Sequence, residues 1–310
     1  MPMDARSTKC YMNILNNTDA QIEIVRQHTE RISDVMFNLF FNWRRTYSKE
    51  NVSESDAIAQ CILQMMNCKL KSFLKLSEGV TIIPHNRLST ILDIPSLTTI
   101  VRSMYELTFI FHNIYAEQKT EAEKNIVLYL WEIRGLNNRQ GLPNVPERYK
   151  EKEENEKTQI EQLRGNIRKI INELDILDEV KSQLEKVIKS DSTKIKGYIF
   201  RKDNNDRIIS FKDIRMEDNV EKLLNLNEYI NVYRFCSVHS HPSYLSVLQF
   251  GQMYNGDEYK NYLKTLLLTI CQLACTMIKD FVENITGAKE IYQKFSDEEK
   301  DACRYFMNEI

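Results

Sequence analysis

The segment from Arg234 to His241 contains side chains whose types and spacing suit chemistry on a phosphate group. Arg234, Ser237 and His241 are three and four residues apart, so a helix over this segment would present them on one face. Arginine can bind a phosphate through two hydrogen bonds and stabilise the charge of a pentavalent transition state. Histidine exchanges a proton near neutral pH, so it can take the proton of a ribose 2′-hydroxyl or return one to the leaving oxygen. The segment therefore indicates RNA cleavage as a candidate reaction, and that reaction requires no metal ion.

A second histidine, His239, lies two residues before His241. In a regular helix the two rings would be about 200° apart, so we expect only one of them to join Arg234. The other interpretation of His241 is a cap at the end of a helix, because a cationic ring suits the negative end of the helix dipole. We interpret Ser237 as a packing or hydrogen-bonding residue, because the sequence has no recognisable acyl-enzyme arrangement that would make it a nucleophile.

A pair of charged residues, Arg102 and Glu106, lies one helical turn apart in an apolar segment, so both side chains face the same way. One interpretation is a buried ion pair that tethers helices. The other gives Arg102 a share in phosphate binding and lets Glu106 orient Arg102, Arg234 or His241.

These two motifs resemble those of the HEPN superfamily. The superfamily is defined by an arginine, four to six intervening residues and a histidine, near the start or end of a helix in a helical bundle. Arg234 satisfies this definition twice, since four residues separate it from His239 and six separate it from His241. Phe235 is a departure, because HEPN nucleases commonly have Asn, Asp or His directly after the arginine.

The chain is also similar to a group of uncharacterised bacterial HEPN-like proteins. Members of that group combine an Arg-x-x-x-Glu helix with a later Tyr-x-x-x-Ser-x-x-x-His-Pro-Ser segment. Arg102 and Glu106 match the first motif, and the second begins at Tyr233 and ends at Ser243.

The resemblance implies a metal-independent endoribonuclease that leaves cyclic phosphate ends and uses no cofactor. It also implies RNA as a partner, a composite site across a homodimer, and a role as a toxin or an effector of antiviral defence. Arg234 would be the phosphate and transition-state ligand, and His241 or His239 the acid and base; the supporting residues would be Arg102, Glu106, Tyr233 and Ser237. Since inactive members exist, the alternative is a non-catalytic helical scaffold, sensor or nucleotide-binding protein that partners another effector.

The composition favours long helices and limits the classes of partner. The 310 residues include only 8 glycines and 6 prolines, which leaves few positions for tight turns. Because the net charge is −2, RNA binding would have to come from a local patch. The seven cysteines form no CxxC pair, which indicates free thiols in a reducing compartment. Without an apolar signal region or a membrane-spanning run, the sequence predicts a cytoplasmic protein that does not enter a membrane.

Periodic apolar residues give the expected elements. The sequence predicts helices over residues 19–47, 53–79, 95–118, 120–136, 217–240 and 257–285, and a short helix capped by Ser296. We expect a loop over 80–95 and a turn over 141–146. Residues 191–215 are expected to form either a polar loop or a small β-hairpin.

Residues 147–190 are highly charged and contain an apolar stripe at heptad spacing that begins at Ile160 and ends at Ile188. This spacing is typical of a coiled coil or a long exposed helical arm, which could bind a partner protein. The other interpretation is a helix that lies on the main body with a solvated outer face.

The sequence therefore predicts an all-α, HEPN-like helical bundle with a long charged arm and at most one small β-hairpin. The expected parts are the N-terminal helices and the first part of the bundle at 1–146, the coiled-coil-like arm at 147–190, and the C-terminal part of the bundle at 191–310.

Overall fold

A computed structural model describes residues 18–47, 52–82, 89–216, 231–253 and 257–307. Most of them are helical, and the strands form two small two-stranded antiparallel sheets, so the prediction of an all-α protein with a small hairpin is confirmed. The contacts divide the chain into two compact units, one made of residues 1–111 and 220–310 and one of residues 112–219. All the candidate site residues belong to the first unit.

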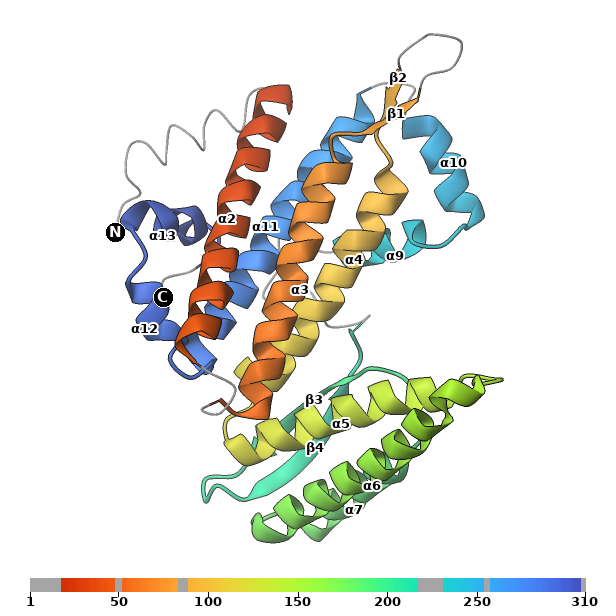
Figure 1. The fold of residues 1–310 in the computed structure, drawn as a ribbon, viewed down its shortest axis with the longest axis vertical. Helices are drawn as coiled ribbons and strands as arrows, with labels where there is room; N and C mark the ends of the chain where they lie inside the picture. The colour runs from red at the N-terminus through yellow and green to blue at the C-terminus, as the bar shows by residue number, and fades with distance from the viewer. Residues whose placement is uncertain (1–17, 48–51, 83–88, 217–230, 254–256, 308–310) are drawn as a thin grey trace. The chain divides into compact units, whose positions relative to one another are not determined.

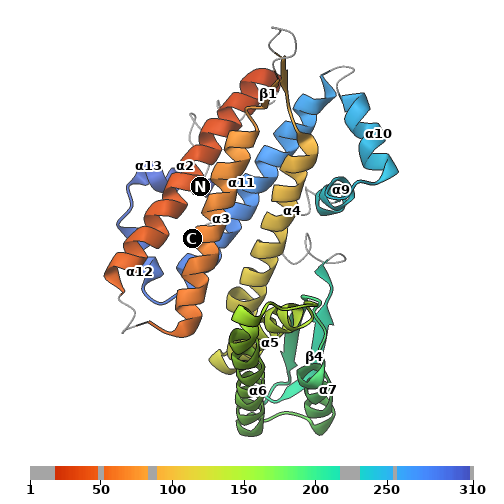
Figure 2. The same cartoon turned by 45° about the vertical axis from the view of Figure 1, so that its right-hand side comes forward.

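The first unit is built around four long helices that run side by side (Figure 1, Figure 2). They are α2 (Thr18–Thr46), α3 (Glu54–Leu76), α4 (Ile94–Phe111) and α11 (Glu258–Asn284). The smaller elements of this unit are β1 (Val80–Ile82), β2 (Ser89–Ile91), α9 (Val232–His239), α10 (Tyr244–Met253), α12 (Ala288–Gln293) and α13 (Asp297–Arg304). The central helix is α11, because it contacts α2, α3 and α4.

The length and composition of α11 would allow it to cross a membrane, but 72% of its most apolar stretch is buried inside the protein. It therefore forms the core of the bundle. Four cysteines of the first unit are also buried, whereas Cys61 and Cys68 on α3 are exposed.

Local capping groups fix where the helices begin. The Ser53 side chain accepts a hydrogen bond of 3.0 Å from the backbone N–H of Asp56 at the start of α3. At the start of α13, Ser296 and Glu299 form a reciprocal capping box. Gly79 follows α3 with a φ of +92°, a left-handed conformation that suits glycine and ends the helix.

Most predicted helices of the first unit are present, and the differences lie in short segments. The predicted loop over 80–95 contains β1 and β2, which pair antiparallel. The predicted helix over 95–118 is present as α4, which changes after Phe111 into the π-helical segment η2 (His112–Ala116). Helices α10 and α12 were not expected, and residues 217–230 of the predicted 217–240 helix lie outside the described residues.

The second unit combines helices with one antiparallel hairpin. Its elements are η2 (His112–Ala116), α5 (Glu121–Gln140), η3 (Glu147–Tyr149), α6 (Lys150–Glu173), α7 (Asp178–Lys189), β3 (Gly197–Lys202) and β4 (Ile208–Ile214). The hairpin alternative for residues 191–215 is therefore the one found. Asn113 anchors the hairpin, because its side chain hydrogen-bonds both the N–H and the carbonyl of Tyr198 at 2.9 Å.

The charged segment 147–190 is not one continuous arm. The chain leaves the helical conformation after Glu173, and α7 begins again at Asp178. Apolar side chains of α6 and α7 are buried against α5 and β4, and an ion pair of 2.8 Å between Arg168 and Glu185 joins the two helices. The heptad stripe is thus the inner face of a packed helical pair, and the segment is part of a larger unit that includes α5 and the hairpin.

Candidate functional site

The candidate site lies where α9 packs against α4 in the first unit. The rings of Tyr105 on α4 and Tyr233 on α9 meet edge to face, with 5.6 Å between their centroids. Cys236, one turn after Tyr233, is fully buried. These apolar contacts fix α9 on α4, so that polar residues of both helices come together at the rim of the packed surface.

The turn after α9 places His241. Helix α9 ends at His239, in agreement with the barrier that Pro242 presents to a continuing helix. Ser243 then caps α10, since its hydroxyl oxygen accepts a hydrogen bond of 3.1 Å from the N–H of Ser246. The Ser246 hydroxyl in turn donates to the His241 carbonyl at 2.9 Å. The backbone N–H of Ser243 and the hydroxyl of Ser246 therefore both hold the carbonyl of His241.

Four of the predicted residues form one network. Arg102 Nη1 lies 3.0 Å from His241 Nε2, although the two residues are 139 positions apart in the chain. Arg102 Nε donates to Glu106 Oε1 at 3.0 Å, and the Tyr233 hydroxyl donates to the same oxygen at 3.4 Å. The structure thus brings the Arg-x-x-x-Glu helix to the Tyr-x-x-x-Ser-x-x-x-His segment.

The network lies at the surface and is only partly shielded from water. The side chains of Arg102 and Glu106 are 27% and 41% exposed, and His241 is exposed. A pair this accessible contributes little to stability, about 1 kcal/mol or less. Stabilisation of the core is therefore a poor explanation for the Arg102–Glu106 pair.

The protonation states follow from the partners. Partial burial lowers the pKa of Arg102, but the Glu106 carboxylate and Tyr233 raise it more, so the guanidinium stays charged. Burial, together with Glu106, raises the pKa of the Tyr233 hydroxyl, which remains a donor. Since a guanidinium can only donate, His241 Nε2 is the acceptor in its contact with Arg102.

Ser237 and Arg234 differ in their relation to this network. A side-chain hydrogen bond joins Ser237 to Tyr233. Arg234 is exposed, and we find no hydrogen bond or ion pair from it to another described residue. The expected partnership of Arg234 with His241 is therefore replaced by a contact between His241 and Arg102. The reason is that α9 ends before His241, so helical spacing no longer determines where this side chain points.

His239 has a different environment from His241. It is 4% exposed, and its ring lies 4.4 Å from the ring of Phe235, which stacks on Tyr262 of α11. Neither ring nitrogen has a hydrogen bond of normal geometry to a described group. Burial lowers the pKa of His239, although the side chain of Gln249 opposes this shift.

An open pocket of about 340 Å³ adjoins the network. Its walls come from the start of α4, from the turn that contains His239 and His241, and from α10. Sequence reasoning missed the contributions of α4 and α10, namely Thr99, Val247 and Phe250. The available signal for α10 was Ser243 before an apolar run, a common start of a helix.

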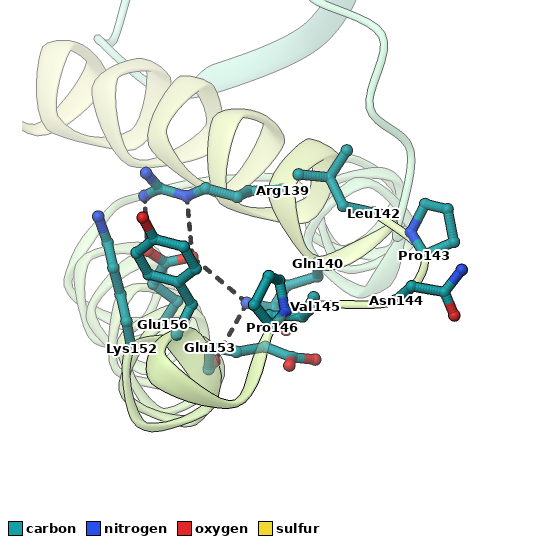
Figure 3. A pocket seen from close by; sticks show the side chains of 11 residues that line it. Arg139, Gln140, Leu142, Pro143, Asn144, Val145, Pro146, Lys152, Glu153 and Glu156 are labelled. Atoms are coloured by element: carbon teal, nitrogen blue, oxygen red, sulfur yellow. Dashed lines mark hydrogen bonds and ion pairs between the residues drawn. The ribbon is translucent and has the colours of Figure 1, made fainter.

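A second pocket of about 420 Å³ lies in the second unit, between the end of α5 and the start of α6 (Figure 3). Arg139 contacts Glu156 through Nε at 3.0 Å and through Nη2 at 2.7 Å. Because the positive charge of Arg139 is already paired, and because no predicted site residue lines this pocket, the first unit provides the better candidate site.

Comparison with known proteins gives one match. A protein-family model described as a family of unknown function (DUF5677) matches residues 88–259, which is more than half of the chain and includes the whole network. No curated protein and no solved structure matches the chain.

Proposed function

We propose that this chain, which belongs to the DUF5677 family, is a metal-independent endoribonuclease of HEPN type whose central pair is Arg102 and His241. The observation that carries this proposal is the 3.0 Å contact between Arg102 Nη1 and His241 Nε2 at the edge of an open pocket. A fixed positive charge and an imidazole at one accessible place are the groups that cleavage of a phosphodiester by a 2′-hydroxyl requires.

Arg102 would bind the scissile phosphate. A guanidinium has five N–H groups, and the contacts of Arg102 with Glu106, His241 and Tyr233 leave others for phosphate oxygens. Glu106 and Tyr233 would act as positioning residues, because they hold the guanidinium from the side away from His241. Binding of the phosphate would draw Arg102 from Nε2 of His241 and release the lone pair of that nitrogen.

His241 would then take the proton of the ribose 2′-hydroxyl. The 2′-oxygen attacks phosphorus, and the bond from phosphorus to the 5′-oxygen of the next nucleotide breaks. The leaving 5′-oxygen takes a proton from the imidazolium or from water. The products are a 2′,3′-cyclic phosphate and a 5′-hydroxyl, and Arg102 would stabilise the extra negative charge of the transition state.

Arg234 has a separate place in the proposal. Since it is exposed and one residue after Tyr233, it would bind a neighbouring phosphate of the RNA and add affinity without touching the reacting atoms. This role fits a protein whose net charge is only −2 and whose RNA binding depends on local cations.

The partners implied by the HEPN resemblance are part of the same proposal: cytoplasmic RNA as substrate, a second copy of the chain, and a role as a toxin or antiviral effector. A surface that would suit a second copy lies beside the pocket, where Tyr244 and Leu245 of α10 are 83% and 47% exposed. Light scattering of the purified protein would give the mass of the assembly.

The test is cleavage of total bacterial RNA by the purified protein in EDTA. We expect wild type and the control Arg44→Ala, an exposed arginine on α2, to cleave, and Arg102→Ala and His241→Ala to lose activity by about a hundredfold or more. Mass spectrometry of the ends should find cyclic phosphates. Equal cleavage by all four proteins would place the activity elsewhere.

The alternative function is a non-catalytic scaffold or sensor. The observation in its favour is that Arg102 is held by Glu106 and Tyr233 across two packed helices, as in a network that tethers helices. A wild-type protein that leaves RNA intact, together with Arg102→Ala and His241→Ala variants that unfold at clearly lower temperature, would favour this function.

A further inference from the structure

The pocket of the second unit, between the end of α5 and the start of α6, has two sides that come from different elements (Figure 3). The end of α5 and the loop after it form one side, which includes Arg139 and Leu142. The first turns of α6 form the other side, which includes Lys152. The volume of about 420 Å³ lies within the range for small-molecule sites, which is roughly 300–1,000 Å³. The pocket is therefore large enough for a small organic ligand.

Polar contacts hold the two sides of the pocket together without a ligand. Arg139 of α5 contacts the Glu156 carboxylate of α6 through Nε at 3.0 Å and through Nη2 at 2.7 Å. The side-chain amide of Gln140 donates to the backbone carbonyl of Glu153 at 3.1 Å. Because these contacts already join α5 to α6, a ligand would bind a preformed pocket, which lowers the entropy that binding costs.

The loop between α5 and α6 is also restrained, and it provides accessible apolar surface. Pro143 and Pro146 have φ angles fixed by their rings. Asn144 between them has a φ of +56°, a left-handed conformation that asparagine adopts more readily than most residues. Two apolar side chains that line the pocket remain accessible, since Leu142 is 58% exposed and Tyr149 is 47% exposed. A ligand with an apolar body could bury part of this surface.

The charges of the lining residues favour an anion. Both acidic side chains of the pocket have partners, because Glu156 contacts Arg139. The other, Glu153, pairs with Lys157 at 3.5 Å. Lys152 is exposed, and we find no hydrogen bond or ion pair from it to another described residue. Its amino group lies at the same edge of the pocket as the guanidinium of Arg139 (Figure 3). One positive charge at this edge is thus available to a ligand.

We propose that this pocket binds a small organic anion with a single negative charge and an apolar body of about the size of one or two rings. Lys152 would pair with the anionic group, and Leu142 and Tyr149 would contact the apolar body. A carboxylate and a phosphodiester both provide such an anionic group. The site lies wholly within the second unit, so the inference does not rest on the proposed RNase site.

The experiment titrates the full-length protein at low salt with anilinonaphthalene sulfonate, a probe whose fluorescence increases when it leaves water. Phenylnaphthylamine, which has the same rings without the sulfonate, is the neutral probe. We expect Lys152→Glu to weaken binding of the sulfonate about tenfold, because an attraction becomes a repulsion, and to leave binding of the neutral probe unchanged. Leu142→Ser should weaken binding of both probes, because it removes apolar surface.

The matched control for Lys152→Glu is Lys169→Glu. Lys169 is also an exposed residue of α6, and it has no hydrogen bond or ion pair to another residue that the structure describes. The Lys169→Glu protein should bind both probes as wild type does, which would exclude an effect of net charge alone. Because Leu142, Lys152 and Lys169 are exposed, the urea midpoint of each variant should stay close to that of wild type.

Displacement of the sulfonate identifies the anionic group. Indole acetate is an aromatic carboxylate and diphenyl phosphate is an aromatic phosphodiester, and we expect at least one of them to displace the probe from wild type. No saturable binding of the sulfonate, equal affinities of wild type and Lys152→Glu for it, or displacement by neither anion would refute the site. Because the readout is binding and not cleavage, the result is distinguishable from the failure of the proposed function.

Discussion

At the scale of single residues, the central feature is that Arg102 contacts three groups with different roles. Glu106 and Tyr233 fix its position, and His241 occupies the side that would face a substrate. The Arg-x₄₋₆-His motif directs attention to Arg234, but the contact with His241 belongs to Arg102. Spacing within one segment could not identify this partner, because the contact spans 139 positions and depends on how α9 packs on α4.

A substitution of Glu106 separates positioning from stability. We predict that Glu106→Gln lowers kcat for RNA cleavage by about tenfold to a hundredfold, because a guanidinium that is misplaced by a fraction of an ångström stabilises the transition state poorly. KM should change little. The free energy of unfolding should change by about 1 kcal/mol or less, since the side chain of Glu106 is 41% exposed.

The matched control for this substitution is Glu283→Gln on α11. Glu283 is 43% exposed and pairs with Lys279 at the same four-residue spacing. The Glu283→Gln substitution should change neither kcat nor KM for RNA cleavage. A Glu106→Gln protein with wild-type kcat and a lower unfolding temperature would show that the network only tethers helices.

Arg234 should have a different kinetic effect. We predict that Arg234→Ala raises KM and leaves kcat unchanged, because an exposed arginine that binds a neighbouring phosphate contributes equally to the ground state and the transition state. The slope of log affinity against log salt should decrease by about one. Titration of RNA into the protein at several salt concentrations measures this slope, and an unchanged slope would exclude Arg234 from the RNA surface.

At the scale of elements, the short turn between α9 and α10 determines where His241 lies. Ser243 caps α10, and Ser246 holds the His241 carbonyl. We predict that Ser243→Ala lowers the free energy of unfolding by about 1 kcal/mol, as loss of an N-cap usually does. It should also lower cleavage, because loss of the cap loosens the first turn of α10, which contains the Ser246 hydroxyl that holds the His241 carbonyl.

Ser53→Ala is the matched control for the cap. Ser53 has the same role at the start of α3, where its hydroxyl accepts from Asp56 at 3.0 Å. Thermal denaturation should give a similar loss of stability for both variants, and only Ser243→Ala should cleave RNA more slowly. If Ser53→Ala slows cleavage equally, the effect of Ser243→Ala arises from lower stability alone.

Helical periodicity predicted the long elements well and the short ones poorly. The apolar residues of α2, α3 and α11 recur over several turns, so each helix has a clear buried face. By contrast, α10 has ten residues, and several of its apolar side chains are exposed, so its pattern matches no buried face. The apolar stripe in residues 147–190 wrongly predicted one continuous helix. The four residues between α6 and α7 are not helical, but they continue the seven-residue spacing of the apolar positions, so the sequence pattern does not reveal the break.

At the scale of the whole molecule, one half-buried and one buried histidine connect stability to pH. Burial lowers the pKa of His28, which contacts Ala302 and Phe306, and burial also lowers the pKa of His239. In the unfolded chain both rings take up a proton below their ordinary pKa of about 6.5, whereas the folded protein takes it up only at lower pH. The contribution of these two histidines to the free energy of unfolding is therefore complete above about pH 6.5, and it decreases as the pH falls.

We predict that the free energy of unfolding, measured with urea, decreases between pH 7 and pH 5. His28→Gln should have a smaller decrease over this interval, because one of the two groups that bind protons preferentially in the unfolded state is gone. A wild-type protein whose stability increases toward pH 5 would contradict the assignment of these histidines as neutral.

The division into two units also limits what sequence alone could predict. The second unit, residues 112–219, is an insertion between α4 and the segment that contains α9. Sequence patterns identified its charged helices and the hairpin alternative. They could not predict that both belong to one packed unit with α5, because those contacts depend on side chains far apart in the chain.

The most direct test of the central claim is a double-mutant cycle on the cleavage rate at saturating enzyme, with Arg102→Ala, His241→Ala and the double variant in EDTA. If the two residues act as one unit, the double variant should cleave about as slowly as the slower single variant. If the two losses multiply, Arg102 and His241 act independently. If neither loss occurs, their 3.0 Å contact has no part in RNA cleavage.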